Sequence, residues 1–299
     1  MKYHNPVLLN ECIEGLNIKP TGIYVDVTFG GGGHSKLILE KLKEGGKLFA
    51  FDQDEKTKEN DFKNNSFKLI NANFRYLKRF LRKEGVKKID GLLADLGVSS
   101  HQFDQAERGF SIRFEGELDM RMNTDSTLTA KEVINNYTEQ ELSDVLYKYG
   151  ELTNSRTIAK QIVSSRENIA IITTKDLTDC ISHLVPEKKK NQFLARIFQS
   201  IRIEVNDEIN SLKEMLNNAV DMLDNSGRLV IISYHSLEDR LVKNLFKKGN
   251  LEGNLKKDFF GNPQKILNEI NSKVIIATEQ EINENSRARS AKLRIAEKV

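Results

Sequence analysis

Four consecutive glycines stand where a short apolar segment gives way to a helical one. The segment reads VDVTFGGGGHS from Val25 to Ser35, with the glycines at 30–33. Because glycine has no Cβ, such a turn between a strand and a helix lets the backbone approach a ligand closely. The spacing is not a nicotinamide fingerprint, since reading Gly30 and Gly32 as its first two glycines puts Ser35 in the third position. The run also lacks the Lys-Ser/Thr ending of a phosphate-binding P-loop. A merely flexible turn is the plain alternative.

An acidic residue follows at the distance expected for a nucleoside ligand. The next apolar segment ends in Asp52, about twenty positions beyond Gly32, where a carboxylate in this architecture can accept hydrogen bonds from both ribose hydroxyls. Asp54 comes soon after. The alternative is that Asp52 begins a loop and Asp54 lies in the first turn of a helix, a position that carboxylates favour. Together the glycine turn and Asp52 predict an adenosine ligand without saying which one.

The elements that must position these residues alternate from Ile23 to Gly97. Short β-branched or apolar segments predict strands, and helical segments begin near Ser35, Asp54 and Phe74. Strands followed by short crossover helices are typical of a parallel sheet, so this part predicts half of a doubly wound α/β sheet. The expected strands cover 23–30, 47–52, 67–72 and 89–97.

The alternation stops between about Ser99 and Arg202, where helical periodicity appears over 138–150 and 156–166. We therefore predict a core formed by 1–105 and 203–299, split by an inserted, mainly helical domain at 106–202. From Asn206 the α/β pattern returns with a helical apolar stripe that closes before Gly227. A strand over 228–233, a helix from Ser236, a strand over 273–280 and a final strand around 291–297 follow.

Composition excludes several classes of protein. No apolar run approaches the roughly 20 residues of a membrane helix, and the first residues lack the pattern of a secretory signal. The two cysteines, Cys12 and Cys180, have no spacing that suggests a disulfide framework or a zinc site, so we expect a cytoplasmic protein without a metal. A net charge of +3 is compatible with a nucleic-acid partner but does not establish one.

Motifs in a fixed order carry a family resemblance that covers nearly the whole chain. They are HNPVLLNE (4–11), YVDVTFGGGGHS (24–35), DLGVSSHQFD (95–104), ERGFS (107–111), LDMRMN (118–123), YGE (149–151), FQSIRIEVNDE (198–208), SYHSLEDR (233–240) and NSRARSAKLR (285–294). With them the chain resembles the bacterial 16S rRNA (cytosine-N4)-methyltransferase family, or MraW family. It departs from the family pattern at 193–196, at Ile112 and at Tyr234, which stands where a Phe is usual. We expect these changes to affect local packing and the RNA contacts of the insertion rather than the cofactor site.

The resemblance implies a Rossmann-like class I methyltransferase sheet, split by the helical insertion, with S-adenosylmethionine at the carboxyl ends of the first strands. It implies that the loop around the methionine part of the cofactor is Gly32, Gly33 and His34, that Asp52 binds the ribose, and that Phe74 contacts the adenine. Asp95 and Gln102 complete the implied set. The residues by themselves indicate only the glycine turn and Asp52; Phe74 and Gln102 rest on the resemblance.

The same resemblance implies the substrate, a decoding-centre cytidine of 16S rRNA near the P site, presented by the small ribosomal subunit. The exocyclic amine of cytosine is a poor nucleophile, so an acceptor for its proton should help, and Asp95 is our leading candidate. His101 and His235 are alternative bases, and water is another. No aromatic residue directly follows Asp95, so Phe103 or Tyr234 is the candidate for stacking on the base. Ser236 and Asp239 have a plainer reading, as a capping box at a helix start.

The predicted RNA contacts are the basic residues of the insertion and of the tail from Arg287 to Arg294. Asp119, Arg121 and Arg240 either contact RNA or form an internal ion-pair network. A homodimer is compatible with the sequence. Three other functions compete: a methyltransferase acting on DNA, protein or a small molecule; an RNA-binding assembly factor with a vestigial cofactor pocket; and a dehydrogenase, which the glycine spacing disfavours.

Overall fold

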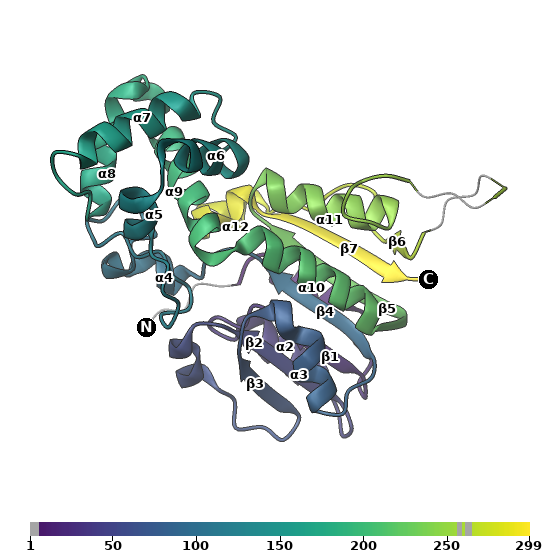
Figure 1. Ribbon diagram of the computed structural model, residues 1–299. Helices are drawn as coiled ribbons and strands as arrows, with labels where there is room; N and C mark the ends of the chain where they lie inside the picture. Colours follow the sequence, from purple (N-terminus) through teal and green to yellow (C-terminus); the bar gives the residue numbers. More distant parts are fainter. Residues whose placement is uncertain (1–5, 256–258, 261–264) are drawn as a thin grey trace. The chain divides into compact units, whose positions relative to one another are not determined.

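The computed structural model describes residues 6–255, 259–260 and 265–299, and it divides into two compact units (Figure 1). The first unit comprises Met1–Gly97 and Ile209–Val299, and the second comprises Val98–Glu208. Each unit is built around buried apolar side chains of its own. The predicted insertion at 106–202 falls within the second unit, and its role in RNA recognition stays a prediction.

One mixed sheet forms the centre of the first unit. Its strand order is β3-β2-β1-β4-β5-β7-β6, in which β1 to β5 pair in parallel and β7 runs antiparallel to both β5 and β6. The predicted α/β class, with a mainly parallel sheet whose sequence is split by an inserted helical segment, is confirmed. The strands are β1 (Ile23–Asp26), β2 (Lys47–Asp52), β3 (Phe67–Asn71), β4 (Ile89–Asp95), β5 (Leu223–Ser233), β6 (Leu267–Glu269) and β7 (Lys292–Lys298).

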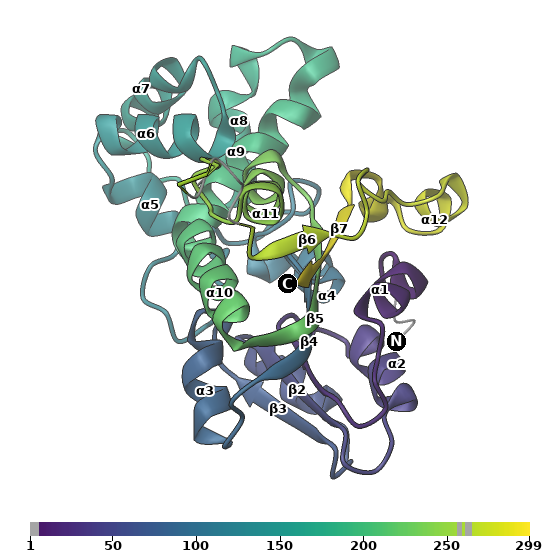
Figure 2. The same cartoon turned by 90° about the vertical axis from the view of Figure 1, so that its right-hand side faces the viewer.

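Helices cover both faces of this sheet, which is why its strands are apolar along their length (Figure 2). Successive side chains of a strand point to opposite faces, so Val25 packs with α3, α10 and α11, while Tyr24 packs with α1 and α2. The helices are α1 (Leu9–Leu16), α2 (Gly33–Lys41), α3 (Leu77–Lys83), α10 (Glu208–Met222), α11 (Ser236–Lys248) and α12 (Glu279–Glu284).

The carboxyl ends of β1, β2 and β4 carry the acidic residues on which the candidate site depends. These strands are parallel neighbours, so Asp26, Asp52 and Asp95 emerge at the same edge of the sheet. In open α/β sheets this is the edge at which ligands bind.

The second unit is helical, and local capping explains where several helices begin. Thr129, Thr138 and Thr173 each accept a hydrogen bond from the backbone N–H three residues later, and the acidic side chain at that position accepts the N–H of the threonine. The predicted helices at 138–150 and 156–166 are present. The helices are α4 (Ser100–Asp104), α5 (Ala130–Asn136), α6 (Glu139–Gly150), α7 (Ser155–Arg166), α8 (Thr174–Ile181) and α9 (Lys190–Asn206).

Two sequence predictions about local structure are wrong. The strand expected over 273–280 is absent: only Ile275 forms a bridge, to Leu293, and Ile276 is 64% exposed. Instead β6 and the side chain of Asn271 occupy that edge of β7, because Asn271 Oδ1 accepts the N–H of Ile295 at 2.8 Å. The helix expected near Asp54 is a 3-10 helix, Glu55–Asn60, which Asp54 caps by accepting the N–H of Lys56.

Among the residues that the structure describes, no helix combines the length and apolarity needed to cross a membrane.

Candidate functional site

The glycine turn between β1 and α2 is tightly packed from behind. Gly30 and Gly32 have φ values of 52° and 77°, in the left-handed region that glycine adopts readily. A Cβ on Gly32 would lie 2.7 Å from Phe62 Cζ, and one on Gly33 would lie 2.2 Å from Pro6 Cγ. The turn therefore has no room for side chains, and it presents backbone.

Asp52 is tied to this turn by its carboxylate. Asp52 Oδ2 accepts the N–H of Gly30 at 2.8 Å, and Oδ1 accepts the N–H of Asp54 at 2.9 Å. Burial raises the pKa of Asp52 to about 6, although the two N–H donors act in the opposite direction. The two positions that the sequence singled out independently are thus joined directly.

Asp26 is a functional candidate that the sequence analysis missed. It ends β1, is only 1% exposed, and accepts hydrogen bonds from Ser35 Oγ at 2.7 Å and from the N–H of Thr28 at 3.1 Å. Burial raises the pKa of its carboxyl. An acidic residue inside an otherwise apolar strand was the signal, since an unpaired charge is rarely buried in a strand without a purpose.

Asp95 is fixed from two sides at the end of β4. Its N–H donates to Thr28 Oγ1 at 2.7 Å, and its Oδ1 accepts a hydrogen bond from the hydroxyl of Tyr234 at 2.7 Å. Burial raises the pKa of Asp95 to about 6, while the charge of His34 and the hydrogen bond from Tyr234 lower it. Tyr234, which the sequence offered only as a stacking residue, is therefore joined to the proposed proton acceptor.

The other residues that were carried over from the family belong to different elements of the structure. His34 lies in the first turn of α2, but its ring is buried and Nε2 is 3.1 Å from the carbonyl oxygen of Val7. Phe74 begins the 3-10 helix Phe74–Tyr76 after β3 and packs, half-buried, against the core. Gln102 belongs to the helical unit, where it forms a capping box with Ser99 at the start of α4. Contacts of these residues with a cofactor stay predictions.

His235 turns back onto its own helix. It is the N-cap of α11: its Nδ1 accepts the N–H of Glu238 at 3.4 Å, and its Nε2 lies 3.2 Å from Glu238 Oε1. The capping box therefore consists of His235 and Glu238, one position earlier than the Ser236 and Asp239 suggested by the sequence. Asp239 is instead paired with Arg294 at 2.7 Å and with Lys292 at 3.4 Å.

Negative charge is concentrated at the carboxyl ends of the strands. The burial of Asp26, Asp52 and Asp95 raises the pKa of each, and the charge of Asp26 raises the pKa of both others further. Neighbouring carboxylates that repel one another favour a cationic ligand, because a positive charge relieves their mutual repulsion. The site therefore suits a ligand with positive charge and hydroxyls.

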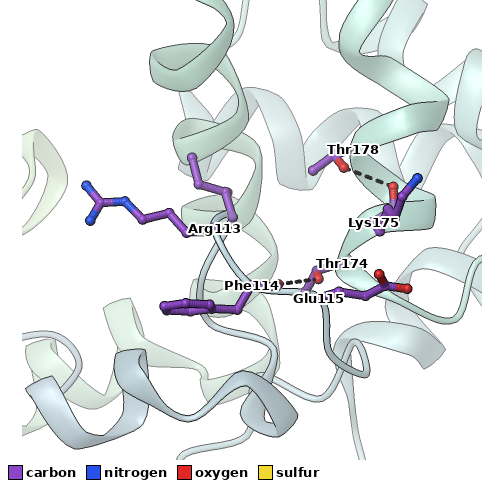
Figure 3. Close-up of a pocket in the computed structure, with 7 residues that line it drawn as sticks. Arg113, Phe114, Glu115, Thr174, Lys175 and Thr178 are labelled. Atoms are coloured by element: carbon purple, nitrogen blue, oxygen red, sulfur yellow. Dashed lines mark hydrogen bonds between the residues drawn. The ribbon is translucent and has the colours of Figure 1, made fainter.

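The helical unit has a surface hollow that does not include Asp26, Asp52 or Asp95 among its lining residues (Figure 3). It has a volume of about 190 Å³ and lies between the loop 112–115 and the start of α8. Thr174 Oγ1 donates to the carbonyl of Phe114 at 2.8 Å, and the side chain of Arg113 points away from α8. None of the residues predicted to bind the cofactor lines it.

An internal ion pair joins the two charged residues of the LDMRMN motif in the helical unit. Arg121 Nε and Nη2 donate to Asp119 at 2.9 and 2.7 Å, and Arg121 Nη1 donates to the carbonyls of Thr124 and Ser126. The guanidinium thus makes four hydrogen bonds to three residues of its own loop. Of the two options that the sequence left open for this pair, the structure contains the internal network.

Comparison with known proteins gives matches over the whole chain. The sequence profile of the MraW methylase family matches residues 1–299. A Flavobacterium johnsoniae protein named ribosomal RNA small subunit methyltransferase H is 55% identical over 302 residues, which cover 100% of this chain and 99% of that protein. A Phocaeicola vulgatus protein of the same name is 54% identical over 296 residues, covering 99% and 97%.

A solved structure also aligns along most of its length. The crystal structure of an rRNA methylase from Streptococcus thermophilus aligns with 97% of this chain and 93% of its own, with 13% identity and a TM-score of 0.43.

Proposed function

The chain belongs to the MraW methylase family, and from this membership we propose that it methylates the exocyclic N4 amine of a cytidine in 16S rRNA. We place that cytidine in the P-site region of the decoding centre, within a cytoplasmic small ribosomal subunit. The observation that carries the proposal is the identity of 54–55% to two relatives named ribosomal RNA small subunit methyltransferase H, over at least 97% of each protein.

The protein is a methyltransferase whose cofactor is S-adenosylmethionine, and its residues fit that group. The side-chain-free turn at Gly32 and Gly33 offers backbone to the methionine part, beside carboxylates that favour the cationic ammonium and sulfonium groups. Asp52 already accepts one N–H on each oxygen, and each carboxylate oxygen has a second lone pair for a ribose hydroxyl.

The remaining cofactor contacts in this proposal come from the family resemblance. Phe74 contacts the adenine, and Asp95 and Gln102 complete the site. His34 contributes through its backbone at the start of α2, since its ring is directed to the carbonyl of Val7. In this arrangement the cofactor lies along the carboxyl ends of β1, β2 and β4.

Positioning is the main chemical task of the chain. When bound, S-adenosylmethionine supplies a methyl group made electrophilic by its sulfonium sulfur. The protein has to hold the attacking amine in line with the bond from sulfur to the methyl carbon. The lone pair of cytosine N4 is delocalised into the ring, so a carboxylate that accepts an N–H of the amine helps to localise it. Asp95 is the acceptor that we propose, because it ends β4, the central strand of the sheet, and one of its carboxylate oxygens remains available.

His235 is the weaker candidate for this task. Its Nδ1 accepts the N–H of Glu238, and its Nε2 faces the carboxylate of the same residue. To accept a proton from substrate at Nδ1, His235 would have to give up the cap of α11. Asp95 can accept a proton without losing its hydrogen bond from Tyr234, since its other carboxylate oxygen remains available.

The target base has to leave its stack to reach this edge, and sugar-phosphate contacts then hold the surrounding RNA. We propose that basic residues of the helical insertion and of 287–294 supply these contacts. Within the tail, Arg289 is exposed, whereas Arg294 is occupied by Asp239. Arg289 is therefore the tail residue that we expect to contact phosphate.

Transfer of labelled methyl from S-adenosylmethionine to small ribosomal subunits that lack the native modification tests the proposal. After digestion of the 16S rRNA, mass spectrometry of the nucleosides should reveal N4-methylcytidine, and mapping should place it at the P site. An Asp52→Asn variant, deficient in cofactor binding, is the matched negative control. Label in another nucleoside, or in protein, would contradict the proposed substrate. Cofactor binding without any RNA methylation would likewise contradict the proposed substrate, whereas absence of cofactor binding in calorimetry would favour an assembly factor.

A further inference from the structure

The hydroxyl of Tyr234 is placed by the sheet against the carboxylate of Asp95. Strands β4 and β5 are hydrogen-bonded neighbours, with Asp95 in register with Ile232, so residue 234 follows just beyond the point where Asp95 ends its strand. The Tyr234 hydroxyl donates to Asp95 Oδ1 at 2.7 Å. This contact joins two residues 139 positions apart.

Both partners are held independently of each other. The N–H of Tyr234 donates to Glu238 Oε2 at 2.9 Å, and its ring packs, partly buried, against the core on the α1 and α2 face. The N–H of Asp95 donates to Thr28 Oγ1, and the following N–H, of Leu96, donates to the carbonyl of Ile232 at 3.0 Å. The hydrogen bond between the side chains is therefore imposed by two fixed backbones.

The arrangement leaves Asp95 with one occupied and one available oxygen. Among the residues that the structure describes, only Tyr234 donates to the Asp95 side chain, and it does so at Oδ1. Oδ2 thus remains for a donor from outside the protein. Because rotation of the carboxylate would break the bond to Tyr234, that bond also fixes the direction in which Oδ2 points.

We propose that Tyr234 is a positioning residue, which acts through Asp95 by holding its carboxylate ionised and directing Oδ2 at the amine of the target base. This inference rests on the proposed function, because it takes Asp95 as the acceptor for that amine.

The transfer step balances without a proton from Tyr234. The amine nitrogen forms a bond to the methyl carbon, the bond from that carbon to sulfur breaks, and sulfur keeps the electron pair. The nitrogen, now positively charged, loses one proton to Asp95 Oδ2. Burial, followed by the charge of Asp95, raises the pKa of the Tyr234 hydroxyl well above its ordinary value, so this group remains a donor throughout.

Several other charged groups face Asp95 and must be included in any pH argument. From β1, Asp26 raises the pKa of Asp95, and from α11, Glu238 raises it as well. From α2, His34 lowers it when charged, and on α1 the thiol of Cys12 feels the charge of Asp95. Against this mainly acidic surrounding, the hydroxyl of Tyr234 is the hydrogen-bond donor that favours the charged carboxylate.

Tyr234→Phe tests the inference, because it removes the hydroxyl and keeps the ring. We expect kcat at pH 7.5 to fall about tenfold and the acidic limb of the pH profile to move up by about one unit. KM for the small subunit and Kd for S-adenosylmethionine should change less than about twofold. Tyr24→Phe is the matched control: it removes another buried hydroxyl of the same unit, one that accepts the N–H of Lys19 at 2.7 Å.

A direct titration separates this inference from the proposed function. In ¹³C-labelled protein without substrate, the Asp95 carboxyl resonance should titrate about one pH unit higher in Tyr234→Phe than in the native protein. An unchanged titration and pH profile would overturn the positioning role. Equal losses in kcat and in Kd for S-adenosylmethionine, with no shift in pH, would overturn it too, as they indicate a structural role. If the native protein methylates no cytidine, the proposed function fails while the titration still decides the link between these residues.

Discussion

The carboxylate of Asp52 and the backbone of Gly30, 22 positions earlier, are joined by a hydrogen bond of 2.8 Å. This bond links the end of β2 to the turn after β1. Asp52, which we propose binds the ribose, and the glycine turn therefore hold each other in place. A change at either residue should affect cofactor binding through both.

Asp52→Asn should weaken binding of S-adenosylmethionine by about 2 kcal/mol, or roughly 30-fold in Kd, because hydrogen bonds to a charged acceptor are replaced by bonds to a neutral one. Isothermal titration calorimetry measures this loss. Glu44→Gln removes an exposed carboxylate from the same unit and should bind like the native protein. Equal affinity of Asp52→Asn and Glu44→Gln would rule out Asp52 as the ribose ligand.

Gly32→Ala should disrupt the turn by crowding as well as by backbone strain. Gly32 has φ 77°, and its added Cβ would meet Phe62 at 2.7 Å; Gly45 has φ 92° with nothing within 4 Å of an added Cβ. Gly45→Ala is thus a control for strain alone, about 1 kcal/mol. We expect Gly32→Ala to lose more than this in urea unfolding and to bind the cofactor at least tenfold more weakly. If the two variants lose the same stability, the close packing behind the turn is not important.

Stability and activity should depend on pH in opposite directions. Asp95 has its pKa raised from 3.8 to about 6, so between these values the folded protein binds more protons than the unfolded chain. Its contribution to the free energy of unfolding is therefore present below about pH 4 and is lost as the pH rises through about 6. The carboxylate that accepts the amine proton becomes the main form of Asp95 above about pH 6, where methyl transfer should be fastest.

Asp95→Asn should consequently raise the free energy of unfolding at pH 8 by about 1 kcal/mol while abolishing most activity; partial exposure reduces the value expected from the pKa shift alone. Asparagine Oδ1 can still accept the bond from Tyr234. Urea unfolding at several pH values measures the effect, and the native and variant curves should converge toward pH 4. Parallel curves would contradict a raised pKa for Asp95.

Arg294 and Arg289 should separate stability from RNA binding. Burial alone raises the pKa of Asp239, but the hydrogen bond and charge of Arg294 hold it below its ordinary value. Arg294→Ala should cost about 1–2 kcal/mol at pH 7, since Lys292 remains 3.4 Å from the carboxylate. Because the pKa of Asp239 is lowered, the pair's contribution is present above the unfolded pKa and lost as the pH falls.

Arg289→Ala should leave the unfolding curve unchanged and weaken RNA binding instead, with a shallower dependence of affinity on salt. Filter binding to 16S rRNA fragments at several salt concentrations measures this. A stability loss at Arg289, or an unchanged salt slope, would argue against the assigned roles.

Much of the fold could be predicted because the parallel strands are buried on both faces. Segments such as 47–52 and 89–95 are apolar nearly throughout, and burial in a parallel sheet is the common reason for such runs. The apolar run at 273–280 has similar composition, yet β7 is already paired there by β6 and by the side chain of Asn271. Several segments can compete to pair with the same edge strand, and the outcome depends on the folded arrangement. The local sequence pattern of one segment does not hold that information.

The candidate site was predictable only where a residue type and its place in the chain together indicate a local role. The glycine turn and Asp52 were found because positive φ and a strand-end carboxylate have recognisable signatures. The contact between Tyr234 and Asp95 was not found, because it depends on β4 and β5 being neighbours. Asp26 was overlooked since its partners, Ser35 and Thr28, are ordinary residues whose hydroxyls gain importance only when the strand ends come together.

Strands β4 and β5 are neighbours in the sheet, but the helical insertion separates them in the sequence. During synthesis, β4 is therefore made well before the strand with which it pairs. Tyr234 leaves the ribosome 139 residues after Asp95, which at common translation rates is a delay of roughly ten seconds. During that interval β4 has an open edge, and open edges invite pairing with other chains. The helical unit, 98–208, has buried apolar side chains of its own around which it can fold in the meantime. The newborn chain is therefore most vulnerable to aggregation midway through translation, and chaperone binding should be greatest at that stage.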